Sequence, residues 1–176
     1  MLWMVNLYGN DTSVLMYGYA SSIKQMSNIP LDIHLMVEDT KDYIDQYIAL
    51  SPHFITIHYE VFNDKKQLKE TIEYIKQNGT QCGLAIKPDT KVEEIYEFLP
   101  YISLLLVMTV EPGKGGQKLI SKTIKKISKL KEYLYQNKLD TYIEADGGIN
   151  GVDIEVAGSY IINSEDYTKS IKELKK

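Results

Sequence analysis

Three glycine-rich segments with polar neighbours are the strongest candidates for a binding or catalytic site in this 176-residue chain. They are residues 111–117 (EPGKGGQ), 146–148 (DGG) and 157–159 (AGS). Glycine lets backbone N–H groups approach an anion closely, so these segments favour a phosphate-binding pocket. Asp146 adds a carboxylate beside those donors, and a carboxylate can act as a general acid or base on a bound molecule. Without their order and spacing, tight turns between elements explain the glycines equally well.

Histidine and methionine side chains within apolar runs are further candidates. His34 lies in the run LDIHLM, and His58 ends the next apolar run with Glu60 close by in the sequence. A single histidine on a strand is more often a hydrogen-bonded core residue than a ligand. Met36 and Met108 at the ends of apolar runs would ordinarily fill the core. Taken alone, these residues therefore favour packing roles.

Short apolar runs alternate with longer amphipathic segments. The strands and helices that these segments form must position the candidate residues. Most of the apolar runs are nearly continuous, which is typical of strands covered on both faces. We expect strands at residues 2–7, 31–36, 54–58, 82–86, 104–109, 142–145 and 154–162. The spacing of apolar residues predicts helices at residues 39–50, 65–77, 91–99, 121–137 and 167–174.

Alternating strands and helices indicate an α/β fold with a parallel sheet, either open and doubly wound or closed into a barrel. The glycine fingerprint of a dinucleotide-binding site does not follow the first expected strand. In both architectures the functional site lies at the carboxyl ends of the strands. The glycine-rich segments are therefore expected to meet at that edge of the sheet.

Length, charge and cysteine content narrow the classes of protein that fit. The length suits one domain over residues 1–176. A formal net charge of −4 argues against nucleic acid or an anionic membrane as the main partner. The apolar start, residues 1–7, is too short to cross a bilayer. The single cysteine, Cys82, cannot form an internal disulfide, so we expect a reducing, cytoplasmic location.

The order of several motifs resembles the ribulose-phosphate 3-epimerase family over nearly the whole chain. The matching stretches are residues 31–37 (LDIHLMV), 55–58 (ITIH), 83–88 (GLAIKP), 107–117 (VMTVEPGKGGQ), 146–149 (DGGI) and 158–159 (GS). The resemblance implies a TIM-type (β/α)8 barrel and an isomerase of the pentose phosphate pathway. Such an enzyme interconverts D-ribulose 5-phosphate and D-xylulose 5-phosphate, with a small phosphorylated ketose as its ligand.

The same resemblance implies roles for individual residues. His34 matches a metal ligand, and Asp146 matches both a metal ligand and one of a pair of catalytic aspartates. The metal would be zinc, or iron or manganese, and would offset the charge of an enediolate intermediate. Met36 and Met108 match residues that line the pocket around the reacting carbons. The predicted sugar and phosphate contacts are Gly113, Gly115, Gly116, Gln117, Gly147, Gly148, Gly158 and Ser159.

This sequence departs from the family pattern in two ways. One affects the expected catalytic activity, and the other affects whether the barrel can close. Trp3 and Val5 stand where the family's second strand carries a His-x-Asp metal pair, whereas a catalytic zinc typically keeps three protein ligands. The family's first strand and helix, and a late helix after residue 149, have no counterpart. We therefore expect an incomplete barrel of seven strands, whose open seam would favour a homo-oligomer.

The residues leave three hypotheses open. The first is a sugar-phosphate 3-epimerase, supported by the glycine-rich loops, Asp146 and His34. The second is an impaired or inactive relative that binds a phosphosugar or a partner protein, supported by the missing carboxylate and ligands. The third is a degenerate gene product, supported by the missing segments. Metal content and turnover of the purified protein would separate them.

Overall fold

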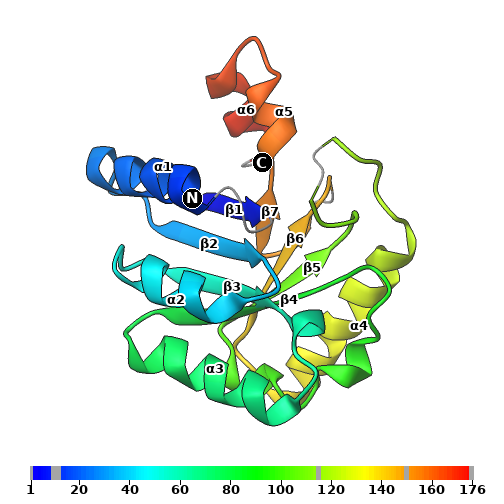
Figure 1. The fold of residues 1–176 in the computed structure, drawn as a ribbon. Helices are drawn as coiled ribbons and strands as arrows, with labels where there is room; N and C mark the ends of the chain where they lie inside the picture. Colours follow the sequence, from blue (N-terminus) through cyan, green and yellow to red (C-terminus); the bar gives the residue numbers. More distant parts are fainter. Residues whose placement is uncertain (1, 9–12, 114–115, 149–150, 175–176) are drawn as a thin grey trace.

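The strands form one curled, parallel sheet that makes an incomplete barrel, as the sequence predicts (Figure 1). The computed structural model describes residues 2–8, 13–113, 116–148 and 151–174. Its seven strands follow one another in chain order across the sheet, with β1 and β7 at the two ends. They are β1 (Trp3–Tyr8), β2 (Leu31–Met36), β3 (Phe54–His58), β4 (Gln81–Ile86), β5 (Leu104–Met108), β6 (Tyr142–Asp146) and β7 (Ile154–Val156).

Helices follow most of the strands and cover the convex face of the curled sheet (Figure 1). The α-helices are α1 (Ser13–Met26), α2 (Thr40–Ile48), α3 (Lys65–Gln77), α4 (Lys122–Asn137), α5 (Gly158–Ile162) and α6 (Tyr167–Leu174). Short 3₁₀ helices lie at η1 (Tyr59–Val61), η2 (Val92–Glu94) and η3 (Leu99–Tyr101). Figure 1 shows α5 and α6 projecting beyond the carboxyl end of β7, away from the other helices.

The two faces of the sheet carry different side chains because successive residues of a strand point to opposite sides. On the helix side, Leu7, Ile33 and Ile57 belong to the large buried core. On the inner side, a smaller apolar cluster contains Leu106 and Met108. Strand alternation therefore places a distinct set of residues inside the half-barrel, including the polar side chains described below.

The register of β1 corrects the alignment suggested by the resemblance. Val5 pairs with Ile33 and is buried in the helix-side core, so it does not stand where a pocket carboxylate would be. Its neighbours Met4 and Asn6 face the inside, because Met4 packs on the inner cluster and Asn6 lines the cavity. A shift of one residue moves every side chain of a strand to the other face.

Two predicted elements differ from those observed. The expected strand at residues 154–162 is a strand only to Val156, and α5 begins at Gly158. The expected helix at residues 91–99 consists of 3₁₀ turns, η2 and the start of η3. Val92, Ile95 and Phe98 are all buried at a spacing of three, which suits a 3₁₀ period better than 3.6 residues. The helix α1 was not among the predicted elements.

A short connection joins β6 to β7, and its described residues contain no helix of the kind that a parallel crossover usually has. Asp153 directly precedes β7, and its N–H donates to the Ile143 carbonyl at 3.0 Å. Its carboxylate accepts the Ile143 N–H at 2.7 Å. The side chain thus satisfies a backbone donor at the beginning of β6 and helps to hold β7 beside it.

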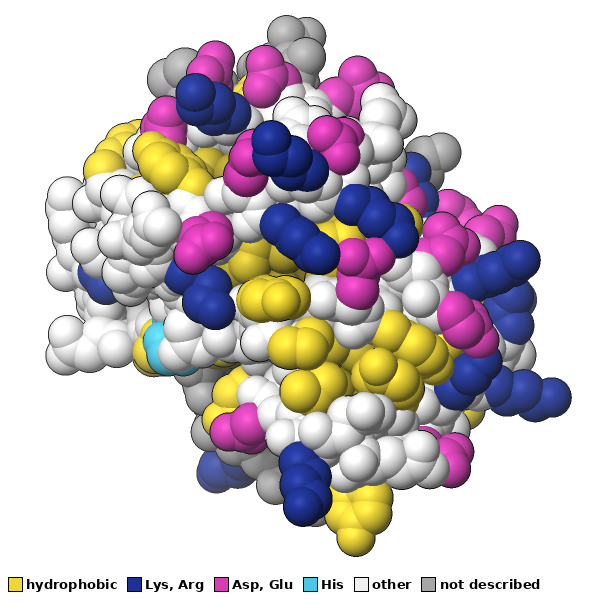
Figure 2. Space-filling model, turned by 90° about the horizontal axis from the view of Figure 1, so that it is seen from below, with side chains coloured by type: hydrophobic (Ala, Val, Ile, Leu, Met, Phe, Trp, Pro, Cys, Tyr) yellow, Lys and Arg dark blue, Asp and Glu magenta, His cyan; other side chains and the backbone are white. Residues whose placement is uncertain are grey.

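The outer surface carries charged side chains around apolar ones on the side of α3 and α4 (Figure 2). Lys65 and Lys69 both pair with Glu97 there. Cys82 on β4 is fully buried, and burial raises the pKa of its thiol to about 12. None of the helices that the structure describes has the length and apolar character required to span a bilayer.

Candidate functional site

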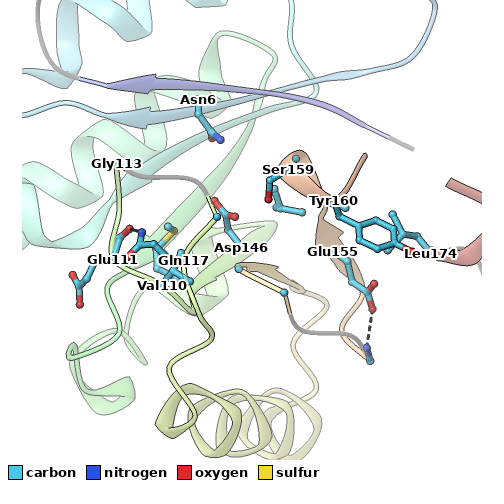
Figure 3. Close-up of a pocket in the computed structure, with 18 of the residues that line it drawn as sticks. Asn6, Val110, Glu111, Gly113, Gln117, Asp146, Glu155, Ser159, Tyr160 and Leu174 are labelled. Carbon is cyan, nitrogen blue, oxygen red and sulfur yellow. Dashed lines mark hydrogen bonds between the residues drawn. The ribbon is translucent and has the colours of Figure 1, made fainter. Parts of the chain in front are cut away.

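A cavity of about 850 Å³ lies at the carboxyl ends of β5, β6 and β7 and is completed by Asn6 of β1 (Figure 3). This is the edge of the sheet where the sequence places the site. Most of the predicted residues line it: Met108, Gly113, Gly116, Gln117, Asp146, Gly147, Gly148, Gly158 and Ser159. His34 and Met36 are not among the described lining residues, and Gly115 lies outside the residues that the structure describes.

Asp146 is the last residue of β6, and its half-buried side chain points into the cavity (Figure 3). Its backbone carbonyl accepts hydrogen bonds from the Thr109 N–H at 2.9 Å and the Thr109 hydroxyl at 2.5 Å. These two bonds fix the strand end to β5 and so orient the carboxylate. Burial raises the pKa of Asp146, which makes it a stronger base than an exposed aspartate.

Gly147 follows with a φ of +125°, a conformation that side chains rarely adopt. A Cβ atom there would overlap the Thr109 hydroxyl and lie 2.7 Å from a methyl group of Val110. Glycine is therefore required where the chain leaves β6.

Acidic groups dominate the charged part of the lining. Glu111, Glu155 and Glu173 are lining residues of the cavity, together with Asp146. Among the described lining residues there is no lysine or arginine. An anion bound here would therefore depend on backbone N–H groups of the glycine-rich turns and on the Ser159 hydroxyl.

Asn6 was not among the residues expected from the sequence, where it reads as an ordinary polar position in an apolar strand. It pairs in register with His34 of β2, and Figure 3 shows its side chain directed from β1 toward the side of the cavity that carries Asp146. The alternation along β1 was the signal that could have found it, had Met4 rather than Val5 been taken as inward-facing.

A chain of hydrogen bonds runs from Asn6 into the interior. The Asn6 side chain lies 3.0 Å from Nδ1 of His34, whose Nε2 lies 2.9 Å from Nε2 of His58. The Nδ1 atom of His58 lies 3.2 Å from the Glu60 carboxylate. Burial, and secondarily His58, holds the pKa of His34 well below its usual range. His34 and His58 are both buried, as the packing interpretation of these residues predicts.

A second polar cluster lies deeper in the half-barrel. Asp32 of β2 and Glu144 of β6 are buried and hydrogen-bonded to each other, and Asp32 also accepts a bond from Thr56 at 3.5 Å. Burial, followed by the charge of Asp32, raises the pKa of Glu144. Burial also raises the pKa of Asp32, so the two carboxyl groups keep a proton between them.

The divalent metal expected from the resemblance does not fit the donors that the structure brings together. Both ring nitrogens of His34 already face other side chains, Asn6 and His58. Asp146 lines the cavity, whereas His34 reaches that cavity only through Asn6. Within the described part of the chain, no three His, Cys, Asp or Glu side chains form a group that could hold a metal ion.

Comparison with known proteins identifies relatives along most of the chain. A model of the ribulose-phosphate 3 epimerase family matches residues 10–162. A ribulose-phosphate 3-epimerase of Helicobacter pylori (strain J99) is 36% identical over 163 residues, 87% of this chain and 74% of that protein. The enzyme of that name from Bacillus subtilis (strain 168) is 33% identical over 165 residues, 88% of this chain and 75% of the relative.

A third relative, the ribulose-phosphate 3-epimerase of Aquifex aeolicus (strain VF5), is 31% identical over 169 residues, 90% of this chain and 75% of that protein. The family model begins just after β1 and ends at the last residue of α5, so its match includes the loops that line the cavity. This chain therefore belongs to the ribulose-phosphate 3-epimerase family, whose members are isomerases.

Proposed function

We propose that this chain binds a phosphorylated ketopentose in the cavity and interconverts D-ribulose 5-phosphate and D-xylulose 5-phosphate. The observation that carries the proposal is the Asp146 carboxylate, with its raised pKa, beside the backbone donors of Gly147 and Gly148. A phosphate could lie against Gly158 and Ser159, at the far side of the same cavity. This arrangement would leave the sugar carbons near Asp146.

In the proposed reaction Asp146 takes the proton from carbon 3 and can return it to the same face. The electron pair moves toward the carbonyl at carbon 2 and gives an enediolate. Because burial raises the pKa of Asp146, the proton is accepted more readily than by an exposed aspartate. The two Thr109 hydrogen bonds hold the strand end and keep the carboxylate aimed at the cavity.

Inversion also requires a proton from the opposite face of the enediolate. Asn6, on the opposing strand, carries a carboxamide, which neither takes up nor releases protons near neutral pH. We therefore expect proton exchange at carbon 3 to be faster than epimerisation. Turnover should be orders of magnitude slower than that of the Helicobacter pylori relative in the same coupled assay.

The experiment is to incubate the protein with D-ribulose 5-phosphate in D₂O and follow deuterium at carbon 3 by NMR, with epimerisation measured in parallel. We expect deuterium to enter ribulose 5-phosphate before xylulose 5-phosphate accumulates. Asp146→Asn should lower the exchange rate by about a hundredfold or more. The exposed Asp140→Asn variant is the control and should exchange like the parent.

The absence of exchange above background in the parent protein would exclude this chemistry. The second candidate function, a relative that binds the phosphosugar without turnover, is favoured by Asn6 on the second face and by the poor fit of a metal. Calorimetric binding of D-ribulose 5-phosphate without exchange would identify that case. Epimerisation as fast as in the complete relative would instead show that another residue serves the second face.

A further inference from the structure

We propose that a second copy of this chain docks at the β1 end of the sheet, with the two β1 strands paired antiparallel and the two α1 helices packed against each other. The contact is two-fold symmetric, so each copy offers the same surface. Neither the ligand nor the reaction of the proposed function enters this contact. Two features of the same sheet edge support it, the unpaired side of β1 and one flank of α1.

The strand β1 is an edge strand without the usual protection against further pairing. It is hydrogen-bonded to β2 on one side only in the described sheet, and its six residues (WMVNLY) include no charge, proline or glycine. Natural edge strands are usually blunted by charged residues, proline or a bulge, because their free N–H and C=O groups pair readily with another strand. The free side of β1 is therefore suited to accept one more strand.

The helix α1 packs on β1, at the end of the row of helices on the convex face (Figure 1). Two contacts show which flank of α1 faces the neighbouring helix. The Tyr17 ring lies 5.6 Å from the ring of Tyr47 on α2, edge to face. The Lys24 Nζ donates to the Ser51 carbonyl, just beyond α2, at 3.4 Å. The opposite flank of α1 therefore points past β1, away from the rest of the sheet.

Four residues with helical spacing, the α1 stripe, form this opposite flank. They are Tyr19, Ser22, Ile23 and Met26, at positions i, i+3, i+4 and i+7. Residues with this spacing lie on one side of a helix, where a second helix can pack along them. Tyr19 and Met26 are 59% and 80% exposed, so both ends of the stripe are open to a partner.

The low charge of this edge favours a second copy as its occupant. Among the residues of β1 and α1, Lys24 alone is charged at neutral pH, and it is directed toward Ser51 rather than along the stripe. The helices α3 and α4, in contrast, are rich in lysine and glutamate. Two identical surfaces can meet without like-charge repulsion when they are neutral. The centres of protein interfaces are likewise poor in charge and enriched in tyrosine and methionine.

The α1 stripe is complementary to itself when the second helix runs in the opposite direction. A two-fold axis beside β1 makes both the strand pair and the helix pair antiparallel. The stripe has the same spacing read from either end, so Tyr19 lies opposite Met26 of the other copy, and a methionine sulfur beside an aromatic ring is a favourable contact. The Ser22 hydroxyl already donates to the Gly18 carbonyl at 2.8 Å, so a close approach of the helices leaves it paired.

Analytical ultracentrifugation of the full chain tests the surface. The parent should sediment as a dimer. Tyr19→Glu places a charge from each copy in the contact and should raise the dissociation constant about a hundredfold. Tyr135→Glu, the same change at an 87% exposed tyrosine of α4, is the matched control and should sediment like the parent. A monomeric parent, or a Tyr19→Glu dimer as tight as the parent, would overturn the proposal.

A second substitution tests the antiparallel arrangement and guards against a variant that merely unfolds. In Tyr19→Glu/Met26→Lys the new carboxylate at position 19 lies opposite the new ammonium group at position 26 of the other copy. This double variant should recover most of the lost affinity, whereas Tyr19→Glu/Met26→Glu should recover none. Circular dichroism should show the same helix content in all three. Equal affinities of the two double variants would contradict the pairing.

Cross-linking supplies a readout that does not depend on affinity. Ser22 lies near the middle of the stripe and hence near the two-fold axis, so Ser22→Cys should form a disulfide-linked dimer in oxidised glutathione. Ser128→Cys on α4 is the matched control, because the Ser128 hydroxyl also donates to the carbonyl four residues earlier and the residue is exposed. The native Cys82 is buried and should not react. Equal cross-linking of the two variants, or none in Ser22→Cys, would overturn the proposal.

Discussion

At the scale of single residues, the most unusual feature is the buried pair formed by Asp32 and Glu144. Two carboxyl groups in contact inside the half-barrel cannot both be ionised at modest cost, because neither is solvated. One oxygen of each has no hydrogen-bond partner among the described residues. The pair therefore lowers the stability of the folded protein, and the size of this effect depends on pH.

We predict that Glu144→Gln stabilises the protein at alkaline pH. Burial raises the pKa values of both Asp32 and Glu144, so the folded chain keeps protons that the unfolded chain releases above about pH 4. The stability of the parent is therefore complete below that pH and declines as pH rises. The carboxamide that replaces the Glu144 carboxyl group can still donate to Asp32 but does not ionise, so the variant should gain about 1–2 kcal/mol near pH 8.

Urea unfolding at pH 4, 6 and 8 tests this expectation. The gain should shrink toward pH 4, and Glu73→Gln, at an exposed position on α3, should show no such trend. The free energy of unfolding of each protein is compared between pH 5 and pH 8. A larger rise in the parent than in Glu144→Gln would contradict the proposal that the buried pair shares a proton.

At the scale of elements, the join between β5 and β6 carries the site. Thr109 binds the carbonyl of Asp146, and the turn that follows has room for glycine alone. The loops and the strand ends that hold Asp146 were predictable from the sequence, because glycine and aspartate at the end of an apolar run mark such a turn.

Three features of the strands and helices were not predictable from the sequence: the direction of Asn6, the contact between His34 and His58, and the end of β7. The inward direction of Asn6 depends on the register of β1 with β2, and an apolar strand reads equally well in either register. The hydrogen-bonded pair His34–His58 joins residues far apart in sequence. The end of β7 at Val156 was missed because the apolar run continues into α5.

We predict that Gly147→Ala destabilises the protein by about 2–4 kcal/mol, since it adds an overlap with Thr109 and Val110 to the strain of a positive φ. Gly148→Ala is the matched control. Gly148 also has a positive φ, +73°, but no contact within 4 Å of its Cβ position is found in the described part of the chain. The control should therefore cost about 1 kcal/mol, the strain alone.

Thermal unfolding of both variants measures the difference, and calorimetric binding of D-ribulose 5-phosphate measures the effect on the cavity. Equal losses of stability in Gly147→Ala and Gly148→Ala would show that the contact with Thr109 is not restrictive.

At the scale of the whole molecule, the sheet is a half-barrel with two ends. The central strands β3 and β5 are buried along their whole length, whereas every residue of β7 is half-buried. The cavity lies where the two ends approach, with Asn6 contributed by β1 and Val156 by β7. The expected homo-oligomer remains a prediction, which light scattering of the purified protein would test.

We predict that backbone amides in the less buried strands of the native protein exchange their hydrogens faster than amides in the fully buried strands. Amides of β7 should exchange first, because the strand is short, partly exposed and paired on one side in the described sheet. Amides of β3 and β5 should exchange last, with the rate of global unfolding. Mass spectrometry of peptic peptides measures both, and protection of β7 equal to that of β5 would contradict the expected order.

The reaction rate of the buried Cys82 thiol can report how often the folded protein opens. It is the single cysteine of the chain, it lies on β4 in the core between the sheet and the helices, and its pKa is raised to about 12 by burial. An alkylating reagent therefore meets a reactive sulfur only in molecules in which that core has opened. The speed of labelling, read from the mass of the intact chain, would time how often the half-barrel comes apart and whether a bound sugar phosphate delays it.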